Sequence, residues 1–197
     1  DLDACTIDGR LTVETSRLGA PAWDASELPD MLFATLRVNF EVIPGEDQLV
    51  SGDTVEVDLP AFAAYAPEQA DGGSTPDLDA FRLNEDGTET DEAIASAQVK
   101  DGVLKATFSD AAATDDANAT VRGYVDVPVS FASSMLGDAE TQQPWTVQKD
   151  GDDERIVMLA LPSASAVLDA WKATRNPLGM LSSALGISDG TVAAESA

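Results

Sequence analysis

The side chains that could carry chemistry in this chain are mostly carboxylates. Its 197 residues include 36 acidic and 11 basic residues, and no histidine. Histidine is the commonest general base and metal ligand, so neither a Ser-His-Asp nor a Cys-His arrangement can be built here. Paired carboxylates can hydrolyse glycosides, but among 36 of them some pairs lie close together by chance. We therefore expect this protein not to be an enzyme.

Calcium is the metal that this composition admits, because carboxylate, amide and carbonyl oxygens alone satisfy it. The richest cluster lies in segment 84–92, where Asn84, Asp86, Glu89 and Asp91 are the candidate ligands. The segment lacks the ligand spacing of the helical calcium loop, and Asp, Asn and Gly are also the residues that solvated turns use. We expect the protein to bind no cofactor. The alternative is a calcium ion bound at this turn.

The cysteine and lysine content removes two kinds of covalent cross-link. Cys5 is the one cysteine, so it can form no intrachain disulfide and cannot anchor a zinc site of cysteines. An internal Lys–Asn isopeptide bond would need a buried lysine facing an asparagine. Lys105 is the best placed lysine, but it lies between Leu104 and Ala106 on the solvent side of an alternating segment. We expect no isopeptide bond.

The charge and hydropathy of the chain exclude several partners. A formal charge of −25 repels nucleic-acid phosphate and anionic lipid. No stretch of 18 or more apolar residues occurs, so membrane insertion is not expected. Such charge favours solubility and suits an extracellular or surface-exposed protein. Neither an export signal nor a wall anchor is visible, which is why we expect the chain to be one piece of a longer protein.

Apolar and polar residues alternate in a series of short segments, the period of strands with one buried face. The Asp101-Gly102 pair is a strong hairpin signal between two of them. Pro128 lies on the polar parity of the last segment and predicts an edge or a bulge. Because no helical pattern separates the segments, we predict an all-β, antiparallel β-sandwich. The expected strands are residues 10–18, 32–43, 54–59, 81–83, 97–99, 103–108 and 118–131.

The last 60 residues follow a different pattern. Segments 145–147 and 156–161 flank an acidic turn and predict a small β-hairpin. Ser163 can cap a helix after it, and Asn176-Pro177 can begin a second helix. We therefore expect two parts. Residues 1–135 form the sandwich, and residues 140–197 form a hairpin and an amphipathic helical segment that packs on the sandwich or on a neighbouring domain.

Several motifs occur in an order that can be compared with a known family. They are Gly52-Asp53-Thr54, Leu59-Pro60, Phe81-Arg82-Leu83, Thr107-Phe108-Ser109-Asp110-Ala111 and the alternating segment 118–131. This order resembles the immunoglobulin-like adhesin domain of Gram-positive cell-wall-anchored proteins, the fibrinogen- and collagen-binding class, over about half of the chain. Two features differ from that family: Ala111-Ala112 replaces an aromatic and a branched residue, and no C-terminal latch strand is recognisable.

The resemblance implies an extracellular module at the cell surface or cell wall that binds a host extracellular protein or peptide. Adjacent domains of the same surface protein would be further partners. The candidate ligand-binding residues lie in segment 61–79, which has the composition of a long loop, and they are Phe62, Tyr65, Asp71 and Asp77. Phe62 and Tyr65 are equally able to fold back as cover for the core.

Two other functions remain open from the sequence. One is a stalk or spacer domain of a cell-surface or pilus protein, which binds nothing itself. The other is a carbohydrate-binding β-sandwich, which would need exposed aromatic platforms. Trp23, Trp145 and Trp171 are scattered along the chain, and Trp171 falls on an apolar helical stripe.

Overall fold

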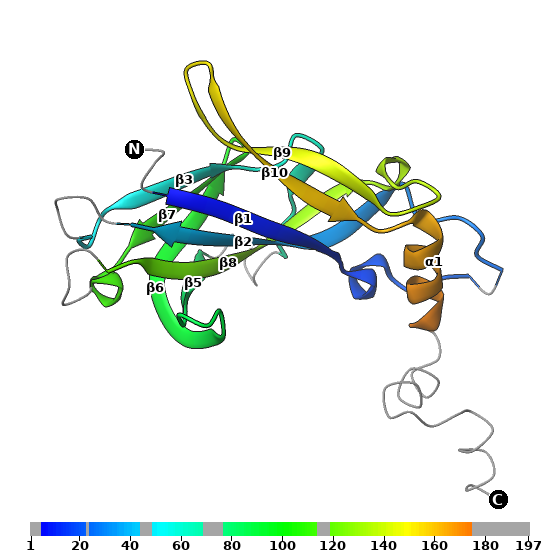
Figure 1. Ribbon diagram of the computed structural model, residues 1–197. Helices are drawn as coiled ribbons and strands as arrows, with labels where there is room; N and C mark the ends of the chain where they lie inside the picture. The colour runs from blue at the N-terminus through cyan, green and yellow to red at the C-terminus, as the bar shows by residue number, and fades with distance from the viewer. Residues whose placement is uncertain (1–4, 23, 44–48, 69–76, 114–118, 175–197) are drawn as a thin grey trace, which may run out of the picture.

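The computed structural model describes residues 5–22, 24–43, 49–68, 77–113 and 119–174. The fold is mostly β and antiparallel, as Figure 1 shows. Seven strands of an eight-stranded sheet follow the order β1-β2-β8-β5-β6-β7-β3, β4 pairs with β8, and β9 and β10 form a two-stranded sheet. The elements are β1 (Cys5–Val13), β2 (Met31–Val42), β3 (Thr54–Asp58), β4 (Ala63–Tyr65), β5 (Leu78–Leu83), β6 (Glu89–Lys100), β7 (Val103–Phe108), β8 (Val121–Ala132), β9 (Thr141–Asp150), β10 (Asp153–Leu161) and α1 (Ala164–Ala173).

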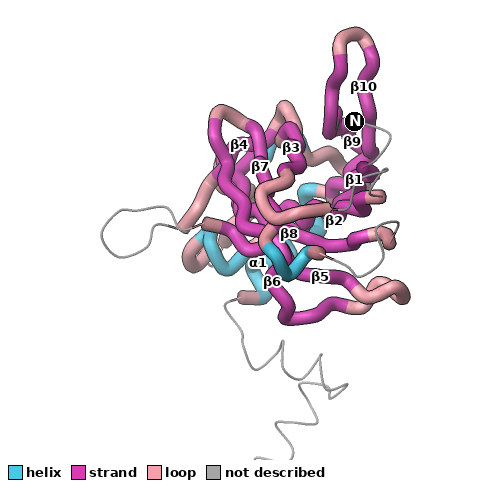
Figure 2. Tube along the Cα trace, turned by 90° about the vertical axis from the view of Figure 1, so that its left-hand side faces the viewer, coloured by secondary structure: helices cyan, strands magenta, loops and turns pink. Residues whose placement is uncertain are grey.

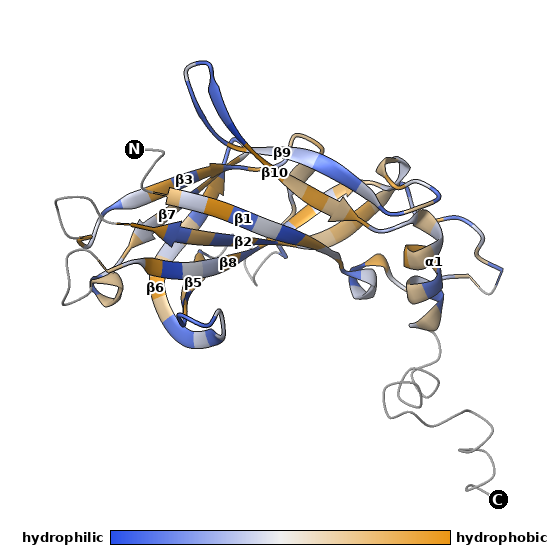
Figure 3. Ribbon diagram, in the orientation of Figure 1, coloured by the Kyte–Doolittle hydropathy of each residue, from blue (hydrophilic) through white to orange (hydrophobic). Residues whose placement is uncertain are grey.

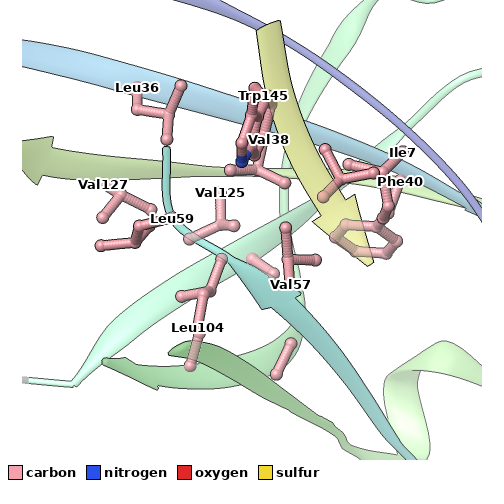
Figure 4. Packing of buried hydrophobic residues seen from close by; sticks show 14 of the residues in the cluster. Ile7, Leu36, Val38, Phe40, Val57, Leu59, Leu104, Val125, Val127 and Trp145 are labelled. Carbon is pink, nitrogen blue, oxygen red and sulfur yellow. The ribbon is translucent and has the colours of Figure 1, made fainter. Parts of the chain in front are cut away.

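The predicted fold class is confirmed: an antiparallel β fold followed by a β-hairpin and a helix. The large sheet curls, so that β3 and β7 face β1, β2 and β8 across one core (Figure 4). The rings of Phe40 on β2 and Phe108 on β7 meet edge to face, with their centroids 5.8 Å apart. The two packed layers are therefore parts of one continuous sheet.

The central pair of strands follows the alternation in the sequence. β2 and β8 pair along twelve residues, from Met31 opposite Ala132 to Val42 opposite Val121. Leu36, Val38 and Val127 are almost fully buried on the inner face. The predictions of a strand over 32–43 and of a closing strand that ends near residue 131 are confirmed.

Other strands differ from the prediction. The first strand is β1, Cys5–Val13, and residues 15–18 of the expected strand form a 3₁₀ turn instead. β6 begins at Glu89 rather than at residue 97, because its first half also pairs with β5. The prediction missed this half because its side chains are mostly exposed and acidic. Segment 61–79 is not wholly a loop, since Ala63–Tyr65 forms β4.

Pro128 lies within a strand that has neighbours on both sides. The Pro128 carbonyl accepts a hydrogen bond from Ala66, so its nitrogen also faces the side of β4 and β5. On that side β8 pairs with β5 at residues 123–125 and with β4 at residues 129–131. The missing N–H therefore falls where β8 changes partner from β5 to β4. Of the edge or bulge that the proline predicted, the edge is wrong, because β8 has neighbours on both sides.

The turn between β6 and β7 confirms the hairpin at Asp101-Gly102. Both residues have positive φ, 53° at Asp101 and 78° at Gly102. Two consecutive residues of this kind characterise a type I′ turn, whose twist matches that of the paired strands.

The β9–β10 hairpin and α1 pack against the large sheet. Trp145, Val147 and Leu159 of the hairpin belong to the same core as the large sheet. The tip of the hairpin stands out from the body in both Figure 1 and Figure 2, and Figure 3 shows that this tip is hydrophilic. Ser163 caps α1 as predicted, by accepting a hydrogen bond from Ala166. The second predicted helix lies outside the described residues, and the division at residues 135–140 stays a prediction.

Arginines join strands on the outer face of the sheet. Arg37 binds Asp126 through two hydrogen bonds of 2.8 and 2.9 Å, pairs with Glu89 on β6, and lies 4.2 Å above the ring of Tyr124. Arg82 pairs with Glu92. The Arg37 pairs link the acidic first half of β6 to β2 and β8, and the Arg82 pair links it to β5.

Candidate functional site

The strongest candidate for a binding site is the free edge of β3, the last strand in the order of the large sheet. The Asp53 carbonyl and the Leu59 amide bond to the main chain of the β6–β7 hairpin. Because peptide groups alternate in direction along a strand, those of Thr54, Glu56 and Asp58 face away from β7. In the part of the chain that the structure describes, no strand pairs with them.

Side chains of β9, rather than its main chain, cover part of this edge. The indole Nε1 of Trp145 donates a 2.6 Å hydrogen bond to the Asp58 carbonyl. The side-chain Nε2 of Gln148 donates a 3.2 Å hydrogen bond to the Glu56 carbonyl. The Oε1 atom of Gln148 is buried and has no hydrogen-bond partner. An incoming N–H group could satisfy this acceptor, which is costly to leave unpaired.

A groove of about 390 Å³ lies between this edge, β9 and the start of β1. Cys5, Val55 and Val147 form its apolar part, and Val147 and Cys5 are almost completely buried. The other lining residues are polar or charged, and they are Thr54, Glu56, Asp58, Gln148, Lys149 and Asp150. An apolar floor with a polar rim beside unpaired peptide groups can accept an extended peptide.

Cys5 contributes a neutral surface to this groove. Burial raises the pKa of the Cys5 thiol to about 11, although the charge of Arg155 opposes the rise. Arg155 also donates a 2.6 Å hydrogen bond to the Cys5 carbonyl. The thiol is therefore protonated near neutral pH and is not an activated nucleophile.

A second groove of about 390 Å³ lies beside β4, near the break in the β8 ladder. Tyr65, Leu78 and Pro128 line one part of it, and Glu14 and Arg17 line another. The Arg17 side chain is already engaged, because it lies over Phe33, donates to the Ala66 carbonyl and pairs with Glu68. Among the described residues, β4 also has a strand partner on one side only, but it is three residues long, so its free edge is shorter than that of β3.

Three of the four ligand-binding residues predicted from the sequence lie in the described part of the chain, and of these Tyr65 and Asp77 are near each other. Tyr65 lines the second groove, and its pKa is raised by burial and by the nearby charge of Asp77. Asp77 accepts a 2.7 Å hydrogen bond from Gln98 on β6. Phe62 packs edge to face against Phe131, so it covers the core. Asp71 lies outside the described residues, and a binding role for this set stays a prediction.

Three of the four predicted calcium ligands, Asn84, Asp86 and Glu89, interact with other residues of the protein. Asp86 accepts hydrogen bonds from the amide and the hydroxyl of Thr88, which lower the pKa of its carboxyl. Asn84 donates to the same hydroxyl, and Glu89 pairs with Arg37. Across the described ranges, no three Asp, Glu, Cys or His side chains gather as a metal site would require. Calcium binding by these residues, including Asp91, stays a prediction.

Sequence reasoning missed the residues that build the β3 groove. Gln148 and Glu56 are 92 positions apart, and no local pattern links them. The one available signal is the alternation in β3 itself, which predicts the strand but does not reveal which of its edges lacks a partner.

Comparisons with known proteins include a distant likeness to a solved structure. No protein-family model matches the chain, and no curated protein matches it. A solved structure of the serine-rich repeat protein Srr2 from Streptococcus agalactiae resembles it with a TM-score of 0.40 and 16% sequence identity. The likeness covers 82% of this chain and 45% of the Srr2 chain, so this chain spans less than half of that protein. It is too distant to assign a function.

Proposed function

We propose that this protein is an extracellular adhesion module that binds an extended segment of a host protein or peptide by strand addition at the β3 edge. The observation that carries the proposal is a row of peptide groups beside a groove, those of Thr54, Glu56 and Asp58, which no strand of the described ranges pairs with. The Glu56 and Asp58 carbonyls accept hydrogen bonds from side chains only. A free edge of this kind is a template for another strand. Main-chain hydrogen bonds would supply the affinity, and the groove would supply the specificity.

The two ends of the edge differ in how readily they can receive a ligand. Trp145 is fully buried, and its indole occupies the Asp58 carbonyl, which closes that end. Toward Thr54, among the residues that the structure describes, the cover is the Gln148 side chain, and its amide is only half satisfied. Rotation of Gln148 would free the Glu56 carbonyl at small cost, because one hydrogen bond of this kind contributes only about 1 kcal/mol.

Two further features support the extracellular part of the proposal. The order of sequence motifs resembles that of Gram-positive surface adhesins, and the formal charge of −25 favours a dispersed, highly solvated module. No helix in the described part of the chain is long and apolar enough to cross a membrane.

The test compares two substitutions at one position of the edge. Glu56→Pro and Glu56→Thr both remove the carboxylate, but only proline removes the N–H that faces the free edge. Both variants and the wild type are presented to an array of host extracellular-matrix and plasma proteins, and circular dichroism checks that each is folded. We expect saturable binding by wild type and by Glu56→Thr, with a loss of about tenfold or more for Glu56→Pro.

Two outcomes would contradict the proposal. Equal binding by Glu56→Pro and Glu56→Thr would show that the main chain of β3 takes no part. If the wild type bound neither a protein nor a glycan, the stalk function would be favoured. If it bound no protein but bound glycans on an array, carbohydrate binding would be favoured.

A further inference from the structure

We infer that the β3 groove selects a peptide with one apolar side chain between Val55, Val147 and Cys5, flanked by residues that are not acidic. This inference rests on the proposed strand addition and adds the chemistry of the ligand to it. It follows from the direction of side chains along β3, the packing at each end of the edge and the charges on the rim.

The side-chain directions on β3 fix where an added strand would point. Val57 is buried and Val55 is half-buried, whereas Thr54 and Glu56 are exposed. In an added strand, the residue opposite Glu56 would point outward with it, and the residues opposite Val55 and Val57 would point inward. Only inward side chains can reach the apolar floor of the groove.

Packing leaves one of these two inward positions open. Val57 is buried and does not line the groove, and the fully buried Trp145 is fixed by its indole to the neighbouring Asp58 carbonyl. Beside Val55, the groove is lined by Val147 and Cys5. The groove therefore accepts one inward side chain of the ligand, the one opposite Val55. The surface that this side chain contacts is apolar and uncharged.

The rim of the groove disfavours acidic neighbours of that side chain. Glu56, Asp58 and Asp150 place three carboxylates on it. Lys149 also lines the groove, but its ammonium lies 3.4 Å from the carboxylate of Glu154. Outward ligand residues opposite Thr54 and Glu56 would face this negative rim, so basic or neutral residues complement it.

The experiment is an NMR titration of the full chain, labelled with ¹⁵N, with three synthetic peptides. The first is acetyl-Thr-Lys-Leu-Lys-Thr-amide, the second replaces leucine by alanine, and the third replaces both lysines by glutamate. We expect the leucine peptide to shift the amides of Thr54 and Glu56 and to bind at least about fivefold more tightly than the alanine peptide. The glutamate peptide should bind at least about tenfold more weakly at low salt, and added salt should narrow that gap.

Cys5 provides a second readout that needs no added label. The chain has one cysteine, and it lines this groove, so its alkylation by iodoacetamide reports on access to the groove. The reaction is run at about pH 9, where more of the raised-pKa thiol is ionised than at neutral pH. The leucine peptide should slow that reaction more than the alanine peptide does. Val55→Thr should remove the preference for leucine, whereas the matched variant Val103→Thr, a half-buried valine outside the groove, should keep it.

The outcomes separate this inference from the proposed function. If the wild type bound all three peptides equally and the Glu56→Pro variant bound none of them, the selectivity would be overturned and strand addition would stand. A leucine preference that survives Glu56→Pro would instead keep the apolar position and overturn strand addition. The absence of any peptide-dependent shift at Thr54 and Glu56 would overturn the inferred ligand chemistry, while the array of host proteins tests the function separately.

Discussion

At the scale of single residues, Trp145 links the core to the groove. Its side chain is fully buried, and its Nε1 atom bonds to the Asp58 carbonyl on the edge of β3. Gly9 on β1 makes room for the indole, since a Cβ atom there would lie 2.8 Å from the ring and 2.6 Å from the Arg37 carbonyl. The closed end of the groove therefore depends on a tryptophan and on a glycine that faces it.

We expect Trp145→Phe to lower the free energy of unfolding by about 2 to 4 kcal/mol, because it leaves a cavity and an unpaired Asp58 carbonyl. Urea unfolding followed by circular dichroism measures this loss. Trp171→Phe is the matched control, since Trp171 also donates to a main-chain carbonyl, that of Gly19, but lies far from the groove in the packing of α1. Only Trp145→Phe should also speed the alkylation of Cys5. Equal alkylation rates in the two variants would contradict a role for Trp145 in closing the groove.

At the scale of elements, the turn between β6 and β7 sets the register of the strand to which β3 is paired. Val103 follows the turn directly and lies opposite Asp58, the last residue of β3. Gly102 has a φ of 78°, and a Cβ atom there would meet nothing within 4 Å. Any cost of a substitution at Gly102 therefore comes from the backbone and not from a clash.

We expect Gly102→Ala to destabilise the fold by about 1 to 2 kcal/mol, because an L-residue with a side chain is strained at this φ. Thermal unfolding gives the measurement. Gly137→Ala is the control, since a Cβ atom there would make only ordinary contacts, at 3.8 Å and beyond. If both variants unfolded at the same temperature as wild type, the left-handed turn would contribute nothing to the stability of this hairpin.

The sequence predicts elements where one face is buried, and it fails where both faces are polar or where a partner is distant. β2 and β7 alternate in polarity and are predicted well. The β9–β10 hairpin is predicted, but its strands extend beyond the predicted 145–147 and 156–161. The first half of β6 is paired with β5 but exposed and acidic, so its sequence resembles that of a solvated turn. The groove could not be predicted, because it depends on contacts such as Trp145 to Asp58, which are 87 positions apart.

At the scale of the whole molecule, the excess of acidic residues is the dominant electrostatic feature. The 36 acidic residues outnumber the 11 basic ones, and several arginines are committed to strand-to-strand pairs, as Arg37 is to Asp126 and Arg122 to Glu41. The unpaired carboxylates repel one another across the surface, which opposes the compact state. The half-buried arginine pairs are screened by salt much less than this long-range repulsion is.

We therefore expect the melting temperature to rise with NaCl between about 0.01 and about 1 M, as the Debye length falls from about 30 to about 3 Å.

Parallel melts in CaCl₂ and MgCl₂ at matched ionic strength separate screening from a specific site. Equal gains in the two salts would fit screening, whereas a larger gain in CaCl₂ that is lost in an Asp86→Asn, Asp91→Asn variant would support the predicted calcium site. That variant leaves Glu89 and its pair with Arg37 intact, so a loss could not come from breaking the β2–β6 contact. A melting temperature that falls with NaCl would mean that the arginine pairs outweigh the repulsion between the carboxylates.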